Sequence, residues 1–330
     1  MVILTNSAGN EISPLRFKKI DVDLNDTKDF VATIAASRYS DDIEKNGRIF
    51  IPNTEFGGLV GEIETRTGDN EVLIKGRSWR GVLSKKIIKP PKGQAYKVVS
   101  GDLNEILKTL IEESNLTELF ETSTMISEPI TSFKFDRYTD LLSGIEKILK
   151  SKGHKLSIMY KQGEQGEPGK VLIEAAKIED YSSRVELSQD NKLDFTFSQT
   201  KNGVNHLICL GKGELTDRVV VDLFLQTDGS IGTVQHYFGV DEVEEVYEDT
   251  SAEDENELIE QGKERLAEIT NKQSFAMDVS RLNITAEIGD IIGGRDYITG
   301  MSLSKPISNK IYTEENGVVK IEYKLEGDDQ

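Results

Sequence analysis

Residues 76–93 read Gly-Arg-Ser-Trp-Arg-Gly-Val-Leu-Ser-Lys-Lys-Ile-Ile-Lys-Pro-Pro-Lys-Gly, and two different kinds of sequence meet there. Before them, short runs rich in β-forming residues alternate with Gly and Asn turns, a pattern typical of a small barrel or sandwich. After them, Pro90 and Pro91 interrupt the chain and a helical pattern begins. We therefore predict a first β-barrel over residues 1–90.

An α/β module is predicted next. Its clearest helix has five apolar residues with the spacing of one helix face: Leu103, Ile106, Leu107, Leu110 and Ile111. Ser100 stands where it can cap this helix. A second helix pattern covers 138–152, and the segments 155–160 and 170–176 flank a polar turn that predicts a hairpin. Two helices and a hairpin make a compact module over 91–180.

The rest of the chain alternates between strand and helix patterns once more. Strand patterns return over 184–226, a helix with apolar residues at 258–269 follows, and strands resume from Phe275. We expect a second β/α module over 181–272 and a second β-barrel over 273–330, completed by earlier strands. The predicted fold class is therefore α+β, with two small β-barrel domains and α/β modules.

The composition excludes several classes of protein. The 330 residues carry 58 Asp and Glu against 40 Lys and Arg, for a formal net charge of −18, and 37% are hydrophobic. Such an apolar fraction argues against wholesale disorder. A surplus of anions argues against sequence-independent nucleic-acid binding, because such proteins neutralise phosphates with Lys and Arg.

The single cysteine and the hydropathy pattern restrict the chain further. Cys209 alone cannot form an intramolecular disulfide or a cysteine-rich zinc site, and its apolar neighbours predict a buried thiol. The first ten residues lack the pattern of a signal peptide, and about 18 apolar residues never follow one another without interruption. We expect a protein made in a cytoplasm that does not insert directly into a membrane.

Catalytic motifs are not found in the sequence. His154, His206 and His236 each stand outside any recognisable nucleophilic arrangement, so each is interpreted as a surface or satisfied core histidine. In the segment 76–81, Arg80 occupies the position where a nucleophile elbow requires Gly. We therefore predict no catalytic, cofactor-binding or metal-ligating residues. Since 58 carboxylates must place some pair close in space, an acidic glycoside hydrolase is the alternative function. A solute-binding or adhesion module of a bacterium is a third.

Two features suggest contact surfaces. Trp79, the only tryptophan, is flanked by Arg77 and Arg80, which predicts either a cation–π cluster at an interface or a core anchor, and we favour the anchor. The run 241–260 contains eleven acidic residues and neither Lys nor Arg. It is interpreted as a solvated loop and helix face, or as a surface that repels polyanions.

Three stretches carry a family resemblance: Gly76 to Leu83 running into Lys86 to Gly93; Asn205 to Glu214 followed by Asp217-Arg218; and Ile288-Gly289-Asp290-Ile291-Ile292-Gly293-Gly294-Arg295-Asp296 with Gly300. Together they resemble the baseplate hub or tail-tip proteins of long-tailed phages, including the N-terminal part of tail-associated lysins and related bacteriocin and injection-machine hubs. Their order and spacing match the family over nearly the whole chain.

The resemblance implies a structural protein and not an enzyme. It implies a homotrimer in which each subunit gives two similar barrels to a ring of pseudo-sixfold symmetry, joining a sixfold tail tube to a threefold tip. The implied partners are a tail tube or distal tail protein, a tip, spike or receptor-binding protein, and a tape measure protein, at the tip of a virion tail. Relatives that continue into a hydrolase make a peptidoglycan-degrading tail enzyme a further alternative. Interface or structural candidates are Arg77, Trp79, Arg80, Arg218, Arg295 and Asp296.

A hub of this kind encloses a channel through which DNA passes without stable binding. A channel wall that carries DNA works best when it does not bind phosphate. Glu244, Glu245 and Glu248 are therefore candidates for an acidic channel wall.

Overall fold

The computed structural model describes residues 1–330 apart from 164–165, 183–185, 189–194, 200–202, 251, 253, 271–272, 279–284, 296–299, 301 and 327–330. Its contacts divide the chain into two compact units. Unit 1 comprises Met1–Phe195 and Met277–Leu325, and unit 2 comprises Thr196–Ala276 with the last few residues. Unit 2 is thus inserted into the sequence of unit 1.

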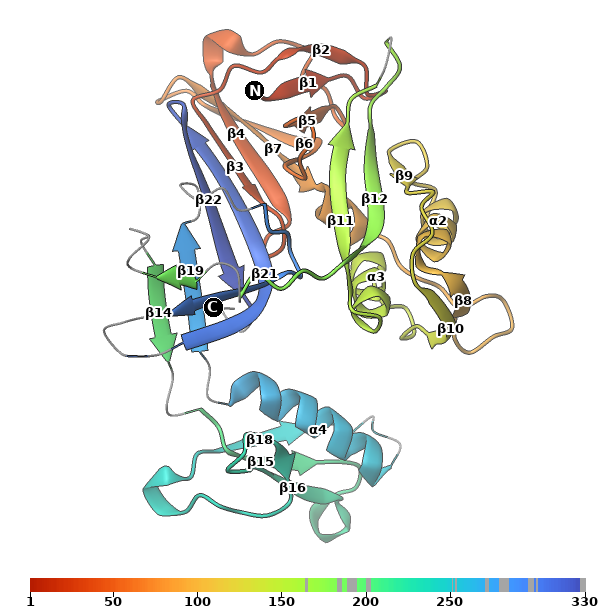
Figure 1. Ribbon diagram of the computed structural model, residues 1–330, viewed down its shortest axis with the longest axis vertical. Coiled ribbons are helices and arrows are strands. Elements are labelled where there is room, and N and C mark those ends of the chain that lie inside the picture. The colour runs from red at the N-terminus through yellow and green to blue at the C-terminus, as the bar shows by residue number, and fades with distance from the viewer. Residues whose placement is uncertain are drawn as a thin grey trace. The chain divides into compact units, whose positions relative to one another are not determined.

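A large sheet forms the first part of unit 1, and the main run of its strands there has the order β22-β21-β3-β4-β7-β6-β5-β1-β2, with β19 (Gln273–Asp278) and β14 (Phe195–Gln199) following β22 (Figure 1). The strands are β1 (Ile3–Thr5), β2 (Glu11–Pro14), β3 (Lys19–Asp23), β4 (Asp29–Ala35), β5 (Arg48–Phe50), β6 (Gly57–Arg66), β7 (Glu71–Ser78), β21 (Ser302–Glu315) and β22 (Val318–Leu325). The 3₁₀ turn η1 (Ala36–Arg38) follows β4. Strands β3 and β4 alternate between buried and half-buried residues, as expected for a sheet with one face on a core.

The two ends of the chain meet in this sheet, because β21 pairs antiparallel with β3. Near this junction Asn309, which is fully buried, accepts the backbone N–H of Asn25 at 2.9 Å and donates to Asp23 Oδ1 at 3.1 Å. Strand β20 (Ile291–Arg295) pairs with β21 and, in parallel, with β13 (Glu186–Ser188). Within the described residues the sheets form no closed barrel, so the prediction of two separate barrels is corrected. Instead, the pairing of β21 with β3 places strands from both predicted barrels in one sheet.

The α/β part of unit 1 has two helices packed on a three-stranded sheet, β11-β12-β9, beside a separate β10-β8 pair. Its elements are α1 (Trp79–Leu83), β8 (Val98–Asp102), α2 (Leu103–Glu113), β9 (Phe120–Thr122), β10 (Pro129–Lys134), α3 (Leu141–Lys150), β11 (His154–Lys161) and β12 (Lys170–Lys177). The predicted helices and hairpin are confirmed. The cap of α2 is not Ser100 but Asp102, which directly precedes the helix and whose carboxylate accepts Asn104 N–H at 2.9 Å.

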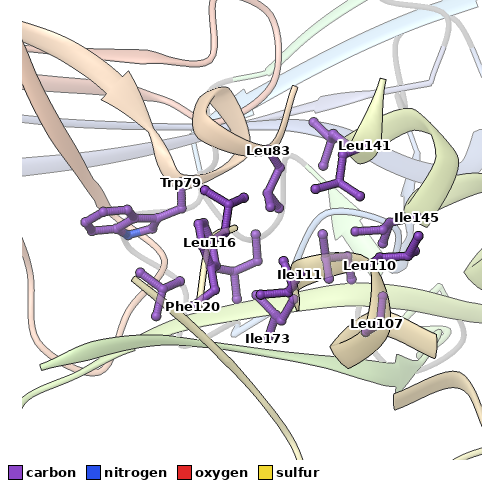
Figure 2. Close-up of a cluster of buried hydrophobic side chains, with 14 of the residues drawn as sticks. Trp79, Leu83, Leu107, Leu110, Ile111, Leu116, Phe120, Leu141, Ile145 and Ile173 are labelled. Carbon is purple, nitrogen blue, oxygen red and sulfur yellow. The ribbon is translucent and has the colours of Figure 1, made fainter. Parts of the chain in front are cut away.

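One apolar core holds this part together. Side chains from α1, α2, α3, β9 and β12 meet in it, as Figure 2 shows for Leu83, Leu110, Ile145 and Ile173 among others. The five residues that predicted α2 are all buried here. Trp79 lies at one end of the same cluster, so α1 joins the large sheet to the α/β part.

Unit 2 is a four-stranded sheet covered on one face by a helix. The strand order is β17-β16-β15-β18, with β15 (His206–Leu210), β16 (Val220–Leu225), β17 (Ile231–Gly232) and β18 (Glu244–Glu248), and the helix is α4 (Glu255–Ile269). Two 3₁₀ turns, η3 (Leu215–Asp217) and η4 (Gly239–Asp241), lie in its connections. Strands β14 (Phe195–Gln199) and β19 (Gln273–Asp278) span the points where the chain passes between units.

The core of unit 2 lies between α4 and the sheet. Leu258 and Leu266 of α4 pack with Leu207 and Cys209 of β15, and Cys209 is fully buried as predicted. The helix approaches closely at Gly262, where an added Cβ would lie 2.5 Å from Cys209 Sγ. Among the described residues, none of the helices is both long and apolar enough to cross a membrane.

Candidate interaction sites

Trp79 lies in the interior of unit 1. Its side chain is fully buried, and its ring stacks on Tyr160 with centroids 5.5 Å apart. Tyr160 in turn stacks on Phe50 at 3.8 Å. This aromatic row connects α1 with β11 and β5. Within one chain, therefore, no face of the indole is left open to a partner.

Arg80 is also buried, but its environment is ionic. Its side chain is 1% exposed; Nε donates to Glu55 Oε1 at 2.6 Å, and Nη1 donates to Glu146 Oε1 at 2.9 Å. Nη2 donates to the Leu156 carbonyl at 3.1 Å. One guanidinium thus ties α1 to the loop before β6, to α3 and to β11. A planar fork with several donors suits Arg for this position.

A second buried ionic group lies near Arg80. Lys155 Nζ is 2.5 Å from Asp290 Oδ2 and 3.1 Å from Glu287 Oε2. Asp290 is fully buried and also accepts the backbone N–H groups of Glu179 and Glu287 at 2.8 and 2.9 Å. Burial lowers the pKa of Lys310 nearby, against the opposing charges of Glu55 and Glu287. These charges connect β11 and β21 with the turn before β20.

The alternative of an acidic glycoside hydrolase requires a carboxylic acid that reaches a sugar. Burial raises the pKa of Glu55, against the opposing effect of Arg80, as expected of a general acid. However, Glu55 is only 10% exposed at its side chain and its carboxylate is held by Arg80. The shifted pKa therefore belongs to an internal ion pair and does not favour a catalytic role for Glu55.

Arg77, Lys85 and Lys89 lie at the surface. Arg77 is exposed on β7 and lines an open pocket of about 340 Å³ with Asp26 and Asp140. A second pocket, of about 520 Å³, is lined by Lys85, Lys86, Lys89 and Lys97 together with Pro91, Leu110 and several neighbours. Lys97 is paired with Glu113 at 2.6 Å, whereas Lys85 and Lys89 are exposed. This pocket gives unit 1 a basic surface on an acidic protein.

The three acidic candidates all lie in β18, which was not predicted as a strand. Each has a cationic or ionisable partner: Glu244 lies 3.3 Å from His206 Nδ1, Glu245 3.0 Å from Arg265, and Glu248 contacts Arg218. Arg218 also donates to the Gly211 carbonyl at 3.1 Å. The structure therefore brings together two candidates that the sequence did not connect, Arg218 and Glu248.

One group of side chains has the composition of a metal site. Ligand atoms of His206, Glu242 and Glu244 all lie within 4.8 Å of one another in unit 2. The sequence predicted no such group.

Comparisons with solved structures match the whole chain. The 43 kDa tail protein of prophage MuSo2 from Shewanella oneidensis aligns with a TM-score of 0.57 at 11% identity, covering 98% of both chains. A tail protein from Neisseria meningitidis MC58 gives 0.53 at 13% identity, covering 98% of this chain and 95% of that one. The chain has the fold of phage tail proteins. A chain from the baseplate of phage P2 in its activated conformation gives 0.51 at 11% identity, covering 100% of both.

Sequence comparisons alone do not find this relationship, since no family model and no curated protein matches. The resemblance predicted from three sequence stretches is nevertheless confirmed at the level of the fold. Of the remaining candidates in those stretches, Arg295 ends β20, and Asp296 lies outside the described residues.

Sequence reasoning missed mainly the residues that form the buried ion pairs of unit 1. Glu55, Lys155 and Asp290 have no distinctive sequence pattern, although Asp290 lies inside a stretch that carried the resemblance. Their importance comes from burial and from partners distant in the sequence, such as Asp290 with Lys155. A buried carboxylate with three donors is recognisable only once the chain has folded.

Proposed function

We propose that this protein is a non-catalytic structural component of a phage or phage-like tail, acting as a baseplate hub at the tail tip. The observation that carries the proposal is the match over 98% of both chains to a prophage tail protein. Because the alignment covers nearly all of both chains, the shared fold is that of the whole chain and not of one common module. Fold alone does not fix function, so the hub role rests on this match together with the three sequence stretches.

In the proposed assembly the chain forms a homotrimer whose subunits build a pseudo-sixfold ring from two similar β-rich regions each. The ring joins a tail tube or distal tail protein to a tip, spike or receptor-binding protein, and also contacts a tape measure protein. The proposed domain boundaries remain those near residues 90, 180 and 272. Support comes from the exposed basic pocket at Lys85 and Lys89, which offers an acidic partner chain a contact surface of opposite charge.

We further propose that β18 lies on the channel wall and that DNA passes it without stable binding. The net charge of −18 and the exposed carboxylates of Glu244 and Glu248 support this, since their side chains are 57% and 59% exposed. Arg265, Arg218 and His206 are each engaged by at least one carboxylate, so they offer passing phosphates little free positive charge.

Labelling the assembled particle tests the location. An epitope appended at Gln330 and detected with gold-conjugated antibody should decorate the tail tip in electron micrographs. Label distributed along the tail, or found only on the head, would overturn the hub assignment. A turbidity assay on purified cell walls should detect no lysis by the chain, and measurable lysis would favour the tail-enzyme alternative instead.

A further inference from the structure

His206 occupies a constrained position in unit 2. It is the first residue of the central strand β15, and its ring stacks on Phe224 of β16 with centroids 4.3 Å apart. The side chain is only 11% exposed. The ring therefore cannot turn freely, and its two nitrogens keep different surroundings.

Carboxylates face both nitrogens. Nε2 lies 2.9 Å from Asp222 Oδ1, and Nδ1 lies 2.8 Å from Glu242 Oε1 and 3.3 Å from Glu244 Oε1. Gln235 Nε2 donates to the same Glu242 oxygen at 2.6 Å and so fixes that carboxylate. Glu242 and Glu244 are two residues apart on the segment that enters β18, which brings both to the Nδ1 side.

With Nε2 facing Asp222, the Nδ1 side of the ring faces the carboxylate oxygens of Glu242 and Glu244. Nδ1 and the two glutamates therefore place three donor atoms around one point in unit 2. Among the described residues, neither glutamate has an ion pair with Lys or Arg. A metal cation bound between them would offset the charge of both carboxylates.

We propose that His206 Nδ1, Glu242 and Glu244 bind a divalent transition-metal ion of the Zn²⁺ class. One imidazole and two carboxylates form a donor set that Zn²⁺ accepts. Tetrahedral Zn²⁺ with bonds near 2.0–2.1 Å needs ligand atoms about 3.4 Å apart. His206 Nδ1 lies 2.8 and 3.3 Å from the two carboxylate oxygens, and all three ligand atoms lie within 4.8 Å of one another, so side-chain rotation can bring them to this spacing.

The outer contacts fit the same assignment. A metal-bound histidine usually donates its other N–H to a carboxylate, which fixes the tautomer and the ring direction, and Asp222 is placed to accept that N–H. Glu244 is 57% exposed at its side chain, which leaves room for water as a fourth ligand. Bound metal would connect β15 to the start of β18, and so would hold the edge strand on the sheet. The inference does not depend on the tail function.

Zinc titration of the chelator-treated full chain at pH 7.5, followed by calorimetry, tests the site. We expect one Zn²⁺ per chain and a rise in the melting temperature of unit 2. Glu244→Gln should weaken binding at least tenfold, and Asp222→Asn about 10- to 100-fold. Glu248→Gln, an exposed carboxylate on the same strand, is the matched control and should leave the affinity unchanged.

Because His206→Gln risks unfolding unit 2, the exposed Glu244 variant carries the genetic test, and NMR of the His206 ring nitrogens in the intact chain provides a second readout. With zinc added, Nδ1 should lose its proton and shift while Nε2 stays protonated. The proposal is overturned if no saturable binding occurs, if Glu244→Gln and Glu248→Gln bind zinc alike, or if both ring nitrogens stay protonated at saturating zinc.

Discussion

The ionic group around Arg80 in unit 1 and the acidic strand β18 in unit 2 are both rich in charge, but they differ in solvent exposure. Arg80 is 1% exposed at its side chain and binds Glu55 and Glu146, whereas Glu244 and Glu248 are more than half exposed. Breaking a buried ion pair leaves an uncompensated charge in a poorly polarisable interior. An exposed pair contributes at most about 1 kcal/mol.

From this difference we expect the buried charges to stabilise the fold and the exposed charges to determine what the surface binds. Arg80, Lys155 and Asp290 connect elements that are distant in the sequence, so their replacement should lower stability. The carboxylates of β18 meet solvent, so their replacement should change what the surface binds while the fold persists.

Removal of the Trp79 ring should cause the largest loss. Trp79→Ala leaves a cavity beside Tyr160 in the core of unit 1 and should lower the free energy of unfolding by about 3–5 kcal/mol, measured in urea. Trp79→Phe is the control and should cost less, because indole Nε1 has no hydrogen-bond partner among the described residues. If Trp79→Ala melts normally but fails to assemble, the ring belongs to a subunit interface.

The next effect concerns the buried ion pair. Glu55→Gln keeps the shape of the side chain but removes the charge that faces Arg80, and should cost about 1.5–3 kcal/mol by the same measurement. The control is Glu62, whose side chain is 65% exposed and pairs with Lys75 at the surface. Glu62→Gln should change the free energy of unfolding by less than about 1 kcal/mol. Equal losses in the two variants would remove the distinction between buried and exposed charge.

Charge reversal on β18 should act on DNA more than on stability. Glu244→Lys, Glu245→Lys and Glu248→Lys together replace partners of His206, Arg265 and Arg218, and loss of the Arg265 and Arg218 pairs should cost about 1 kcal/mol or less each. Genome ejection should slow, and the defect should weaken with added salt.

A triple variant with the same charge change on α4, at Glu255, Glu260 and Glu264, separates position from net charge. Ejection should slow less in this control. If ejection is normal in the β18 variant, the acidity of β18 only keeps the protein soluble, and the channel-wall proposal fails for these residues.

The smallest expected effect concerns the Cys209 thiol, which should react only slowly with thiol reagents in the native chain. Burial raises the pKa of its thiol to about 11, so about one thiol in a thousand is ionised at pH 8. A thiol-reactive disulfide reagent should label the native chain far more slowly than the chain in urea. Rapid labelling of the native chain would mean that α4 does not close the core of unit 2.

Local sequence patterns predicted the elements whose contacts are local. The stripe from Leu103 to Ile111 identified α2, and the polar turn after Lys161 identified the hairpin of β11 and β12. Pairing between β3 and β21 joins residues nearly 300 positions apart. The hydrophobic periodicity of a segment cannot predict such a distant partner. The prediction of two separate closed barrels was therefore wrong. A strand such as β18, dominated by Glu, also contradicts ordinary β propensity.

The candidate sites follow the same division. Trp79 and Arg80 were found because a single Trp between two Arg is conspicuous in the sequence. Glu55 and Asp290 are ordinary acidic residues until folding buries them. His206, Asp222 and Glu242 are separated by 16 to 36 positions, and only the sheet of unit 2 brings them together.

The most direct test of the central claim, that this chain is a tail hub, is its assembly state in light scattering coupled to size exclusion. The 36.8 kDa chain should elute as a trimer, either alone or after mixing with tail-tube protein, and images of that peak should show rings with pseudo-sixfold symmetry. A stable monomer under both conditions would contradict the account.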